Sequence, residues 1–322
     1  MSTALKAAQA AGSHWGLAAK SCIEALTPLP DAANLGFVYV TEGFADDLSS
    51  IVTFLRETTP VQHWLGGVGY GILGPDGEVQ EGRALTLMVG HVADEALRPF
   101  SGFDPANPDD FLAEHGDWLS SQSMVTGLVH GDAREPHLGE MIAGLAAAAP
   151  AFLVGGLTAA SEAPTHVAGR VVGAGLSGAL FGDGAPLVTG LSQGCQPIGP
   201  VHRVTEVVDN VVMGLDGQAA LDLLKEEAGD IIARDLKRAA GYIHVAQPIE
   251  GSDNPHDYVV RSLLGIDPKR GWLAVGGHLV NGDRLMFVRR DPNAARHDLN
   301  RMLDGLAARI GDRPIKGGVY VS

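Results

Sequence analysis

Residues 190–194 read Gly-Leu-Ser-Gln-Gly, which fits the G-x-S-x-G nucleophile elbow of serine hydrolases. Cys195 follows at once, so one short stretch offers both a hydroxyl and a thiol as candidate nucleophiles. An elbow needs a helix directly after the serine, because the strained strand-to-helix turn is what exposes the hydroxyl. Here Pro197 and Pro200 follow and prevent a helix from starting. We therefore expect a turn without catalytic function, and a hydrolase using Ser192 or Cys195 is kept as an alternative.

Histidines are the next residues that could carry chemistry. His91, His130 and His244 lie in apolar, strand-like surroundings, where a buried neutral imidazole could serve as a proximal haem ligand. A haem-based gas sensor is therefore a second alternative. The histidine spacings do not match those of zinc ligands, so we predict no metal site.

Charge and composition limit the classes of protein that need to be considered. The 322-residue chain has 23 basic and 38 acidic residues and a net charge of −15, which argues against a nucleic-acid surface. The chain has only two cysteines, so we expect no disulfide framework. Its N-terminus has no basic region followed by an apolar segment, and we therefore expect a cytoplasmic location.

One uncharged stretch, residues 141–161, has the length of a membrane span. It is rich in Ala and Gly, and Pro150 divides it into a helix-like and a strand-like half. We expect a buried helix–turn–strand at this place and no contact with a membrane.

The order of elements repeats along the first part of the chain. We predict helices over 13–26 and 46–57 and strands over 35–40, 61–67 and 83–92. The helix over 46–57 should bury one apolar face, formed by Leu48, Ile51, Val52 and Leu55. The same order returns with helices over 108–121 and 136–149 and strands over 124–131, 151–156 and 171–182. This suggests an internal repeat, 13–92 and 108–182, with Gly66-Gly67 and Gly155-Gly156 in equivalent turns.

From residue 200 the pattern changes. Residues 202–217 predict a hairpin that turns at Asp209-Asn210. We predict helices near 218–226 and 229–239, strands near 241–247, 258–264, 272–276 and 284–290, and a helix over 291–310 capped by Asp291. The final residues, 316–322, resemble the strand near 36–41, so we expect a strand that begins a further repeat and leaves this domain incomplete at its C-terminus.

Several segments together resemble FIST proteins. They are GLSQGCQPIGP at 190–200, the hairpin ending in GLDGQAALDLLKE, GDRLMFVRRDPNAARHDLNRML at 282–303, and the paired strand–Gly-Gly segments at 64–71 and 153–161. The resemblance implies a FIST-N-like domain over 1–199 and a FIST-C-like domain over 200–322. From the element pattern we expect an α/β (α+β) fold with mixed β-sheets covered by helices and βαβ-type repeats.

The resemblance also implies a cytoplasmic sensory protein that binds a small ligand, with amino acids or related metabolites as candidates. The ligand-binding residues we expect are Gly155, Gly156, Thr158, Ser161, Ser192 and Gln193. Arg83 or Arg170 could pair with a ligand carboxylate. We expect no catalysis and no cofactor apart from the haem alternative, a signalling protein as partner, and possible pairing of two copies as a homodimer.

Overall fold

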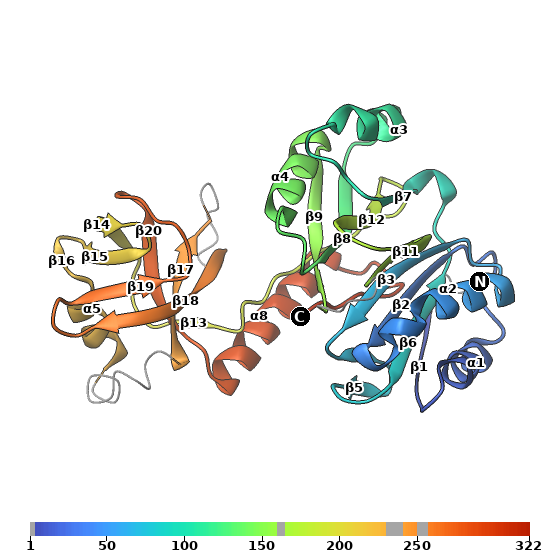
Figure 1. Cartoon of the computed structure of the whole chain (residues 1–322), viewed down its shortest axis with the longest axis horizontal. Coiled ribbons are helices and arrows are strands. Elements are labelled where there is room, and N and C mark those ends of the chain that lie inside the picture. Colours follow the sequence, from blue (N-terminus) through green and yellow to red (C-terminus); the bar gives the residue numbers. More distant parts are fainter. Residues whose placement is uncertain (1–3, 160–164, 230–240, 250–256) are drawn as a thin grey trace. The chain divides into compact units, whose positions relative to one another are not determined.

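The computed structural model describes residues 4–159, 165–229, 241–249 and 257–322. The chain forms two compact units, one comprising residues 1–187 with 312–322 and the other residues 188–311. In Figure 1 residues 1–187 of the first unit run from blue to yellow-green and its residues 312–322 are red, while the second unit runs from yellow through orange to the red α8.

The first unit contains two mixed sheets and a small hairpin. The first sheet has the order β1 (Lys6–Ala11), β6 (Ala84–Gly90), β2 (Leu35–Thr41), β3 (His63–Gly69), β10 (His166–Ala168) and β11 (Arg170–Val172). The second sheet has the order β7 (Leu97–Ser101), β12 (Leu176–Phe181), β8 (Val125–Asp132) and β9 (Ala151–Thr158). The hairpin pairs β4 (Ile72–Gly74) with β5 (Gly77–Val79).

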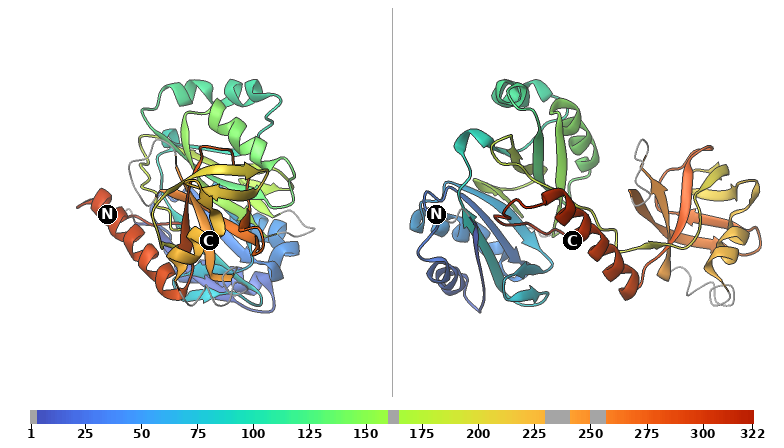
Figure 2. Two further views of the ribbon diagram at one scale, coloured as in Figure 1. Left: turned by 90° about the vertical axis from the view of Figure 1, so that its left-hand side faces the viewer. Right: turned by 180° about the vertical axis from the view of Figure 1, so that it is seen from behind.

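Helices cover the outer faces of these sheets (Figures 1 and 2). They are α1 (Trp15–Leu26), α2 (Leu48–Thr58), α3 (Pro108–Ser120) and α4 (Leu138–Ala148), with short 3-10 turns over Glu42–Asp47 and Asp94–Ala96. In α2 the predicted apolar stripe is the buried face, formed by Leu48, Ile51, Val52 and Leu55. One hydrophobic cluster draws its side chains from strands of both sheets and includes Phe37, Leu65, Leu128 and Phe181.

The two sheets share one topology. In each, a parallel pair (β2 with β3, β8 with β9) is flanked by an antiparallel strand (β6, β12) that in turn pairs with another antiparallel strand (β1, β7). The α+β class and the mixed sheets predicted from the sequence are confirmed.

Gly66 and Gly155 mark the same place in the two sheets. Gly66 pairs with Val38 and has φ +141°, and Gly155 pairs with Val129 and has φ +149°. A Cβ at these glycines would lie 1.9 Å from the Val38 carbonyl oxygen and 1.8 Å from the Val129 carbonyl oxygen. Both glycines lie inside strands, so the prediction of equivalent turns was wrong, and the need for glycine comes from close strand approach.

Two further predictions for the first unit were wrong. The expected strand over 171–182 is divided into β11 and β12, with Gly175 at φ +80° in the bend between them. The expected strand over 316–322 is irregular. It is held by a hydrogen bond from the Leu5 N–H to the Lys316 carbonyl (2.7 Å) and by packing of Val319 in the core between the sheets, and no strand ladder forms among the described residues.

The uncharged stretch at 141–161 forms a helix, a turn and a strand as far as it is described, but only a minority of its described residues are buried. Within α4 the buried residues are Leu138 and Leu145. In β9 the side chains of Phe152 and Leu157 are 63% and 64% exposed. Among the described residues no helix combines the length and apolarity needed to cross a bilayer.

The second unit is built on a closed antiparallel barrel. Its strands are β13 (Gln196–Pro197), β14 (His202–Val208), β15 (Val211–Leu215), β16 (Gln218–Ala219), β17 (Ile243–Pro248), β18 (Tyr258–Asp267), β19 (Trp272–Val275) and β20 (Arg284–Arg289). The path β20-β14-β15-β19-β18-β17 closes because β17 also pairs with β20. The helices α5 (Ala220–Ala228) and α8 (Pro292–Ile310) accompany it.

Two sequence predictions for this unit are confirmed. The hairpin of β14 and β15 turns at Asp209-Asn210, with Asp209 at φ +54°. The Asp291 side chain caps α8 by accepting hydrogen bonds from the N–H groups of Asn293 and Ala294 (both 2.9 Å). The helix predicted near 229–239 falls almost entirely outside the described residues.

Candidate functional site

A group of polar side chains, buried apart from the half-buried Tyr39, lies in the first unit and is contributed by both sheets. We call it the histidine–hydroxyl cluster, and its members are Tyr39, His130, Thr158, Thr165, His166 and Ser177. Tyr39, His130 and Thr158 lie in the carboxyl-terminal halves of the parallel strands β2, β8 and β9. His166 begins β10, whose pairing with β3 brings it back from the second sheet to the first. Carboxyl ends of parallel strands are a common place for ligands in α/β sheets.

Hydrogen bonds connect the members in pairs. The Tyr39 hydroxyl lies 3.0 Å from His130 Nε2, and His166 Nδ1 lies 2.6 Å from Ser177 Oγ. The hydroxyls of Thr158 and Thr165 are 2.7 Å apart. His166, Thr165 and Ser177 are completely buried, and His130 is 4% exposed.

Each histidine of the cluster has one buried ring nitrogen, Nδ1 of His130 and Nε2 of His166, that lacks a hydrogen-bond partner of normal geometry among the described residues. The Ala174 backbone is nevertheless close enough to His166 to raise its pKa. Unpartnered buried nitrogens are rare in folded proteins, because an unpaired buried polar group loses its bonds to water without replacement. These two nitrogens make the cluster the candidate binding site of the first unit.

Both histidines are held neutral. Burial lowers the pKa of His130 to about 4, and the proximity of His166 lowers it further. Burial also lowers the pKa of His166, although Asp132 and the backbone of Ala174 act in the opposite direction. A neutral imidazole can present either an N–H or a lone pair, so each unpartnered nitrogen can donate or accept according to its tautomer.

An ion pair stands at the end of β8, beside the cluster. Arg134 donates from Nε to one oxygen of Asp132 (3.0 Å) and from a terminal nitrogen to the other (2.7 Å). These bonds lower the pKa of the Asp132 carboxyl against the opposing effect of burial. The side chain of Asp132 is 2% exposed and that of Arg134 is 36% exposed, so the pair joins the buried cluster to the surface.

The residues expected on β9 have different surroundings. Thr158 belongs to the cluster and also donates to the Gly131 carbonyl (3.3 Å). Gly155 is required by strand approach, and a side chain at Gly156 would meet Val321. Ser161 lies outside the described residues. Two members of the cluster were named from the sequence, Thr158 as a ligand contact and His130 as a haem ligand. Tyr39, Thr165, His166 and Ser177 carry no local motif and were missed.

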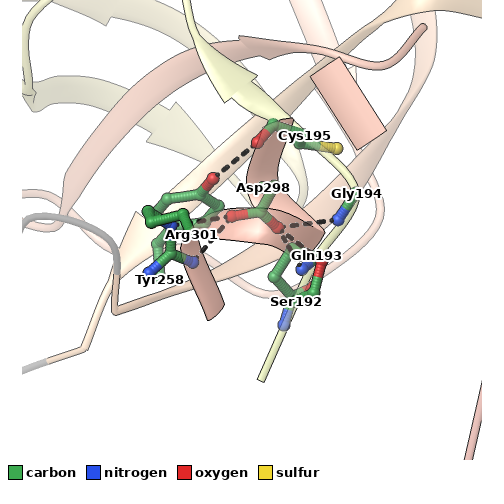
Figure 3. Close-up of polar contacts among 7 residues, drawn as sticks. All are labelled: Ser192, Gln193, Gly194, Cys195, Tyr258, Asp298 and Arg301. Carbon is green, nitrogen blue, oxygen red and sulfur yellow. Dashed lines mark hydrogen bonds and ion pairs between the residues drawn. The ribbon is translucent and has the colours of Figure 1, made fainter. Parts of the chain in front are cut away.

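Ser192 and Gln193 belong to the second unit, where Asp298 of α8 organises the GLSQG turn (Figure 3). One Asp298 oxygen accepts from Ser192 Oγ (2.8 Å), Gln193 N–H (2.8 Å) and Gly194 N–H (3.0 Å). The other oxygen accepts two bonds from Arg301, at 2.6 and 3.0 Å. Although burial raises the pKa of Asp298, the bonds from Arg301 and Ser192 outweigh it and the net shift is downward. The turn is thereby tied to α8.

The geometry around this turn bears on the hydrolase alternative. The Ser192 hydroxyl donates to the Asp298 carboxylate and not to an imidazole that could accept its proton. Burial raises the pKa of the Cys195 thiol, an effect that Arg290 only partly offsets, so the thiol stays protonated at neutral pH. The backbone carbonyl of Cys195 accepts a hydrogen bond from the Tyr258 hydroxyl (3.0 Å).

The three candidate haem ligands lie in unrelated surroundings. His91 is exposed, with Nδ1 3.0 Å from the Ala32 carbonyl, and His244 is half-buried on β17 of the second unit. His130 is enclosed by packed strands and its Nε2 is engaged by Tyr39, which does not fit the axial ligand of a haem. Across the described part of the chain no group of three or more His, Cys, Asp or Glu residues is placed to hold a metal ion.

The two arginines expected to meet a ligand carboxylate differ in their contacts. Arg83 donates to Asp47 (2.9 Å) and lies over the Phe44 ring, 5.1 Å from its centroid. Arg170 begins β11 and is exposed. Neither arginine belongs to the histidine–hydroxyl cluster.

Comparison with known proteins gives two family matches and a small number of relatives. The FIST N domain matches residues 34–218 and the FIST C domain matches residues 220–322. The chain is 32% identical over 147 residues, 42% of its length, to the uncharacterized protein Rv0628c of Mycobacterium tuberculosis, and 31% identical over 140 residues, 40% of its length, to the uncharacterized protein Mb0898c of Mycobacterium bovis. The matched regions span 37% and 34% of these relatives. No solved structure matches the chain.

Proposed function

Because this chain belongs to the FIST family, whose domains are associated with sensory and signal-transduction roles, we propose that it is a cytoplasmic sensor of a small ligand. The ligand is an amino acid or a related metabolite, and the protein binds it without catalysis. The histidine–hydroxyl cluster is its binding site.

The observation that carries this proposal is the pair of buried ring nitrogens, on His130 and His166, that have no hydrogen-bond partner of normal geometry in the described part of the chain. An amino acid has a carboxylate that accepts hydrogen bonds and an ammonium group that donates them. Two neutral imidazoles and the neighbouring hydroxyls can form hydrogen bonds with both groups, because each imidazole nitrogen donates or accepts according to its tautomer. Desolvation makes each such bond stronger than at the surface, and it penalises ligands that leave a polar atom unpaired.

The position of the cluster supplies a way to transmit binding. Its members come from strands of both sheets, so a ligand that bonds to His130 and His166 acts on the packing of one repeat against the other. A ligand shifts a conformational equilibrium by its difference in affinity for the two states. A signalling protein that binds one of these states is the partner we propose.

A thermal-shift screen tests the binding site. The panel is the twenty common L-amino acids and small carboxylic acids, applied to the wild-type chain, His166→Ala and Ser177→Ala. His244→Ala is the matched control, because His244 also has a buried Nδ1 without a partner but belongs to the second unit. A ligand at about 100 times its Kd adds about 2.7 kcal/mol of stability.

We expect at least one compound to raise the melting temperature of the wild-type and His244→Ala proteins and to have no effect on His166→Ala. A shift of equal size in His166→Ala would place the binding site elsewhere. A panel without any effect on the wild-type protein would contradict the amino-acid class.

A further inference from the structure

Strand β9 forms the outer edge of the second sheet (Figure 1). It pairs with β8 on one side, and within the described part of the chain no strand pairs with its other side. Val321 packs against Gly156, while Phe152 and Leu157 near the two ends of the strand are 63% and 64% exposed. An exposed apolar edge strand presents backbone donors and acceptors that can pair with another chain.

The equivalent edge of the first sheet is covered. Strand β3 holds the place in the first sheet that β9 holds in the second, since Gly66 of β3 corresponds to Gly155 of β9. Antiparallel β10 pairs with β3 through Val167 and Gly66, and residues 64–68 are all buried. Two strands of the same construction thus differ in one respect: the first has an antiparallel neighbour and the second has none among the described residues.

The charge distribution limits what can cover β9. The chain has a net charge of −15, yet residues 141–159 carry no charged side chain. Edge strands are commonly protected by charged residues or proline, and β9 has neither within its length. Two copies of this acidic chain can meet at this uncharged edge without bringing like charges together. Elsewhere on the acidic surface, the repulsion between like charges opposes such a contact.

We propose that β9 is a dimerisation edge, and that its partner is β9 of a second copy of this chain. A two-fold axis perpendicular to the sheet makes two identical edge strands antiparallel, which is the direction that β10 takes on β3. The two four-stranded sheets then form one continuous sheet, and Phe152 and Leu157 of each copy become covered. The contact is isologous and uses up both edges, so the assembly stops at two chains.

Sedimentation equilibrium of the full chain over a range of concentrations tests the proposal. Phe152→Lys and Leu157→Lys each place a charge on the edge, so a dimer of either variant carries two added like charges at the seam, which opposes pairing. Leu17→Lys is the matched control, because Leu17 is a 69% exposed leucine on α1, away from β9. All three sites are exposed, so the substitutions leave the core intact.

The expected result is a mass that rises from one to two chains with concentration for the wild-type and Leu17→Lys proteins and stays at one chain for both β9 variants. Amide hydrogen exchange in β9 should slow with concentration in the wild-type protein and not in Phe152→Lys. A wild-type mass of one chain throughout, or a dimer that persists in both β9 variants, would overturn the proposal. If Leu17→Lys weakened dimer formation as much as the β9 variants do, the proposal would also be overturned, because the change in net charge and not the position on β9 would explain the effect.

Discussion

Tyr39 and His130 occupy equivalent positions in the two sheets and face each other, with the hydroxyl 3.0 Å from Nε2. Tyr39 pairs with Gly67 one residue after the Val38–Gly66 pair, and His130 pairs with Gly156 one residue after the Val129–Gly155 pair. The candidate binding site is therefore centred on a contact between equivalent positions of two sheets of the same topology, one occupied by tyrosine and the other by histidine.

Removing the Tyr39 hydroxyl should destabilise the first unit. Tyr39→Phe leaves both ring nitrogens of His130 without a partner in a buried site, which should lower the free energy of unfolding by about 1–3 kcal/mol. Tyr320→Phe is the control, because the Tyr320 side chain is 59% exposed, and it should have no measurable effect. Urea denaturation measures both, and equal stability of the Tyr39→Phe and wild-type proteins would show that the bond contributes nothing.

Acid should destabilise the first unit through His130. Its folded pKa of about 4 lies below the ordinary value of 6.5, so between these pH values the unfolded state binds more protons than the folded state. The contribution of a neutral His130 is thus fully present above about pH 6.5 and is lost as the pH falls toward 4. His130→Asn should flatten the decline in melting temperature over this range. His137→Asn, at an exposed histidine, should leave it unchanged.

Features that depend on residues close in the chain could be predicted from the sequence, whereas those that depend on long-range packing could not. The stripe of α2, the Asp291 cap and the turn at Asp209-Asn210 depend on residues close in the chain, and all three were predicted correctly. β1 and β10 were missed. β1 pairs with β6, and β10 pairs with β3, at separations of more than seventy residues, and β10 contributes only a short local hairpin with β11.

The candidate site shows the same limit. His130 and Thr158 could be singled out from their neighbours in the sequence, but the contact of His166 with Ser177 depends on how β10 returns toward β12. Conversely, GLSQG matches a known motif. Its partner Asp298 lies 106 residues from Ser192 and belongs to no motif. A motif shows what chemistry a residue could do, and the distant partner decides whether the geometry for it exists.

Asp298→Asn should disrupt the GLSQG turn more than Ser192→Ala does. The amide keeps one acceptor where the carboxylate has two, and it leaves the half-buried positive charge of Arg301 without a counterion. Loss of one partner of a fully buried ion pair lowers stability by about 3–5 kcal/mol, so we expect a smaller loss here, still above the roughly 1 kcal/mol expected for loss of the Ser192 hydroxyl. Asp304→Asn, at an exposed position on the same helix, is the control. Comparable losses in the two test variants would mean that Arg301 does not depend on Asp298.

Neither cysteine should react readily in the folded protein. Burial, with a smaller effect from Asp76, raises the pKa of Cys22 to about 12, and burial raises that of Cys195 as well. We expect slow labelling by iodoacetamide at neutral pH and labelling of both thiols in urea. A fluorophosphonate probe should leave Ser192 unmodified. Rapid labelling that Ser192→Ala or Cys195→Ala abolishes would favour the hydrolase alternative over a sensor.

Substituting Gly66 or Gly155 by alanine should destabilise the first unit severely and to a similar degree. Each glycine has positive φ, and an added Cβ would lie within 2 Å of a carbonyl oxygen of the neighbouring parallel strand, which cannot move without breaking the ladder. We expect a loss of about 4 kcal/mol or more for each variant, because backbone strain and a backbone clash add together.

Gly116→Ala in α3 is the control for this pair. The nearest atom to a Cβ at Gly116 is 3.9 Å away, so alanine should fit and stabilise the helix by about 1 kcal/mol. Chemical denaturation of the three variants measures the differences. A large loss in Gly66→Ala with a small one in Gly155→Ala would show that exposed β9 relaxes where covered β3 cannot, and that the two sheets are alike in topology but not in rigidity.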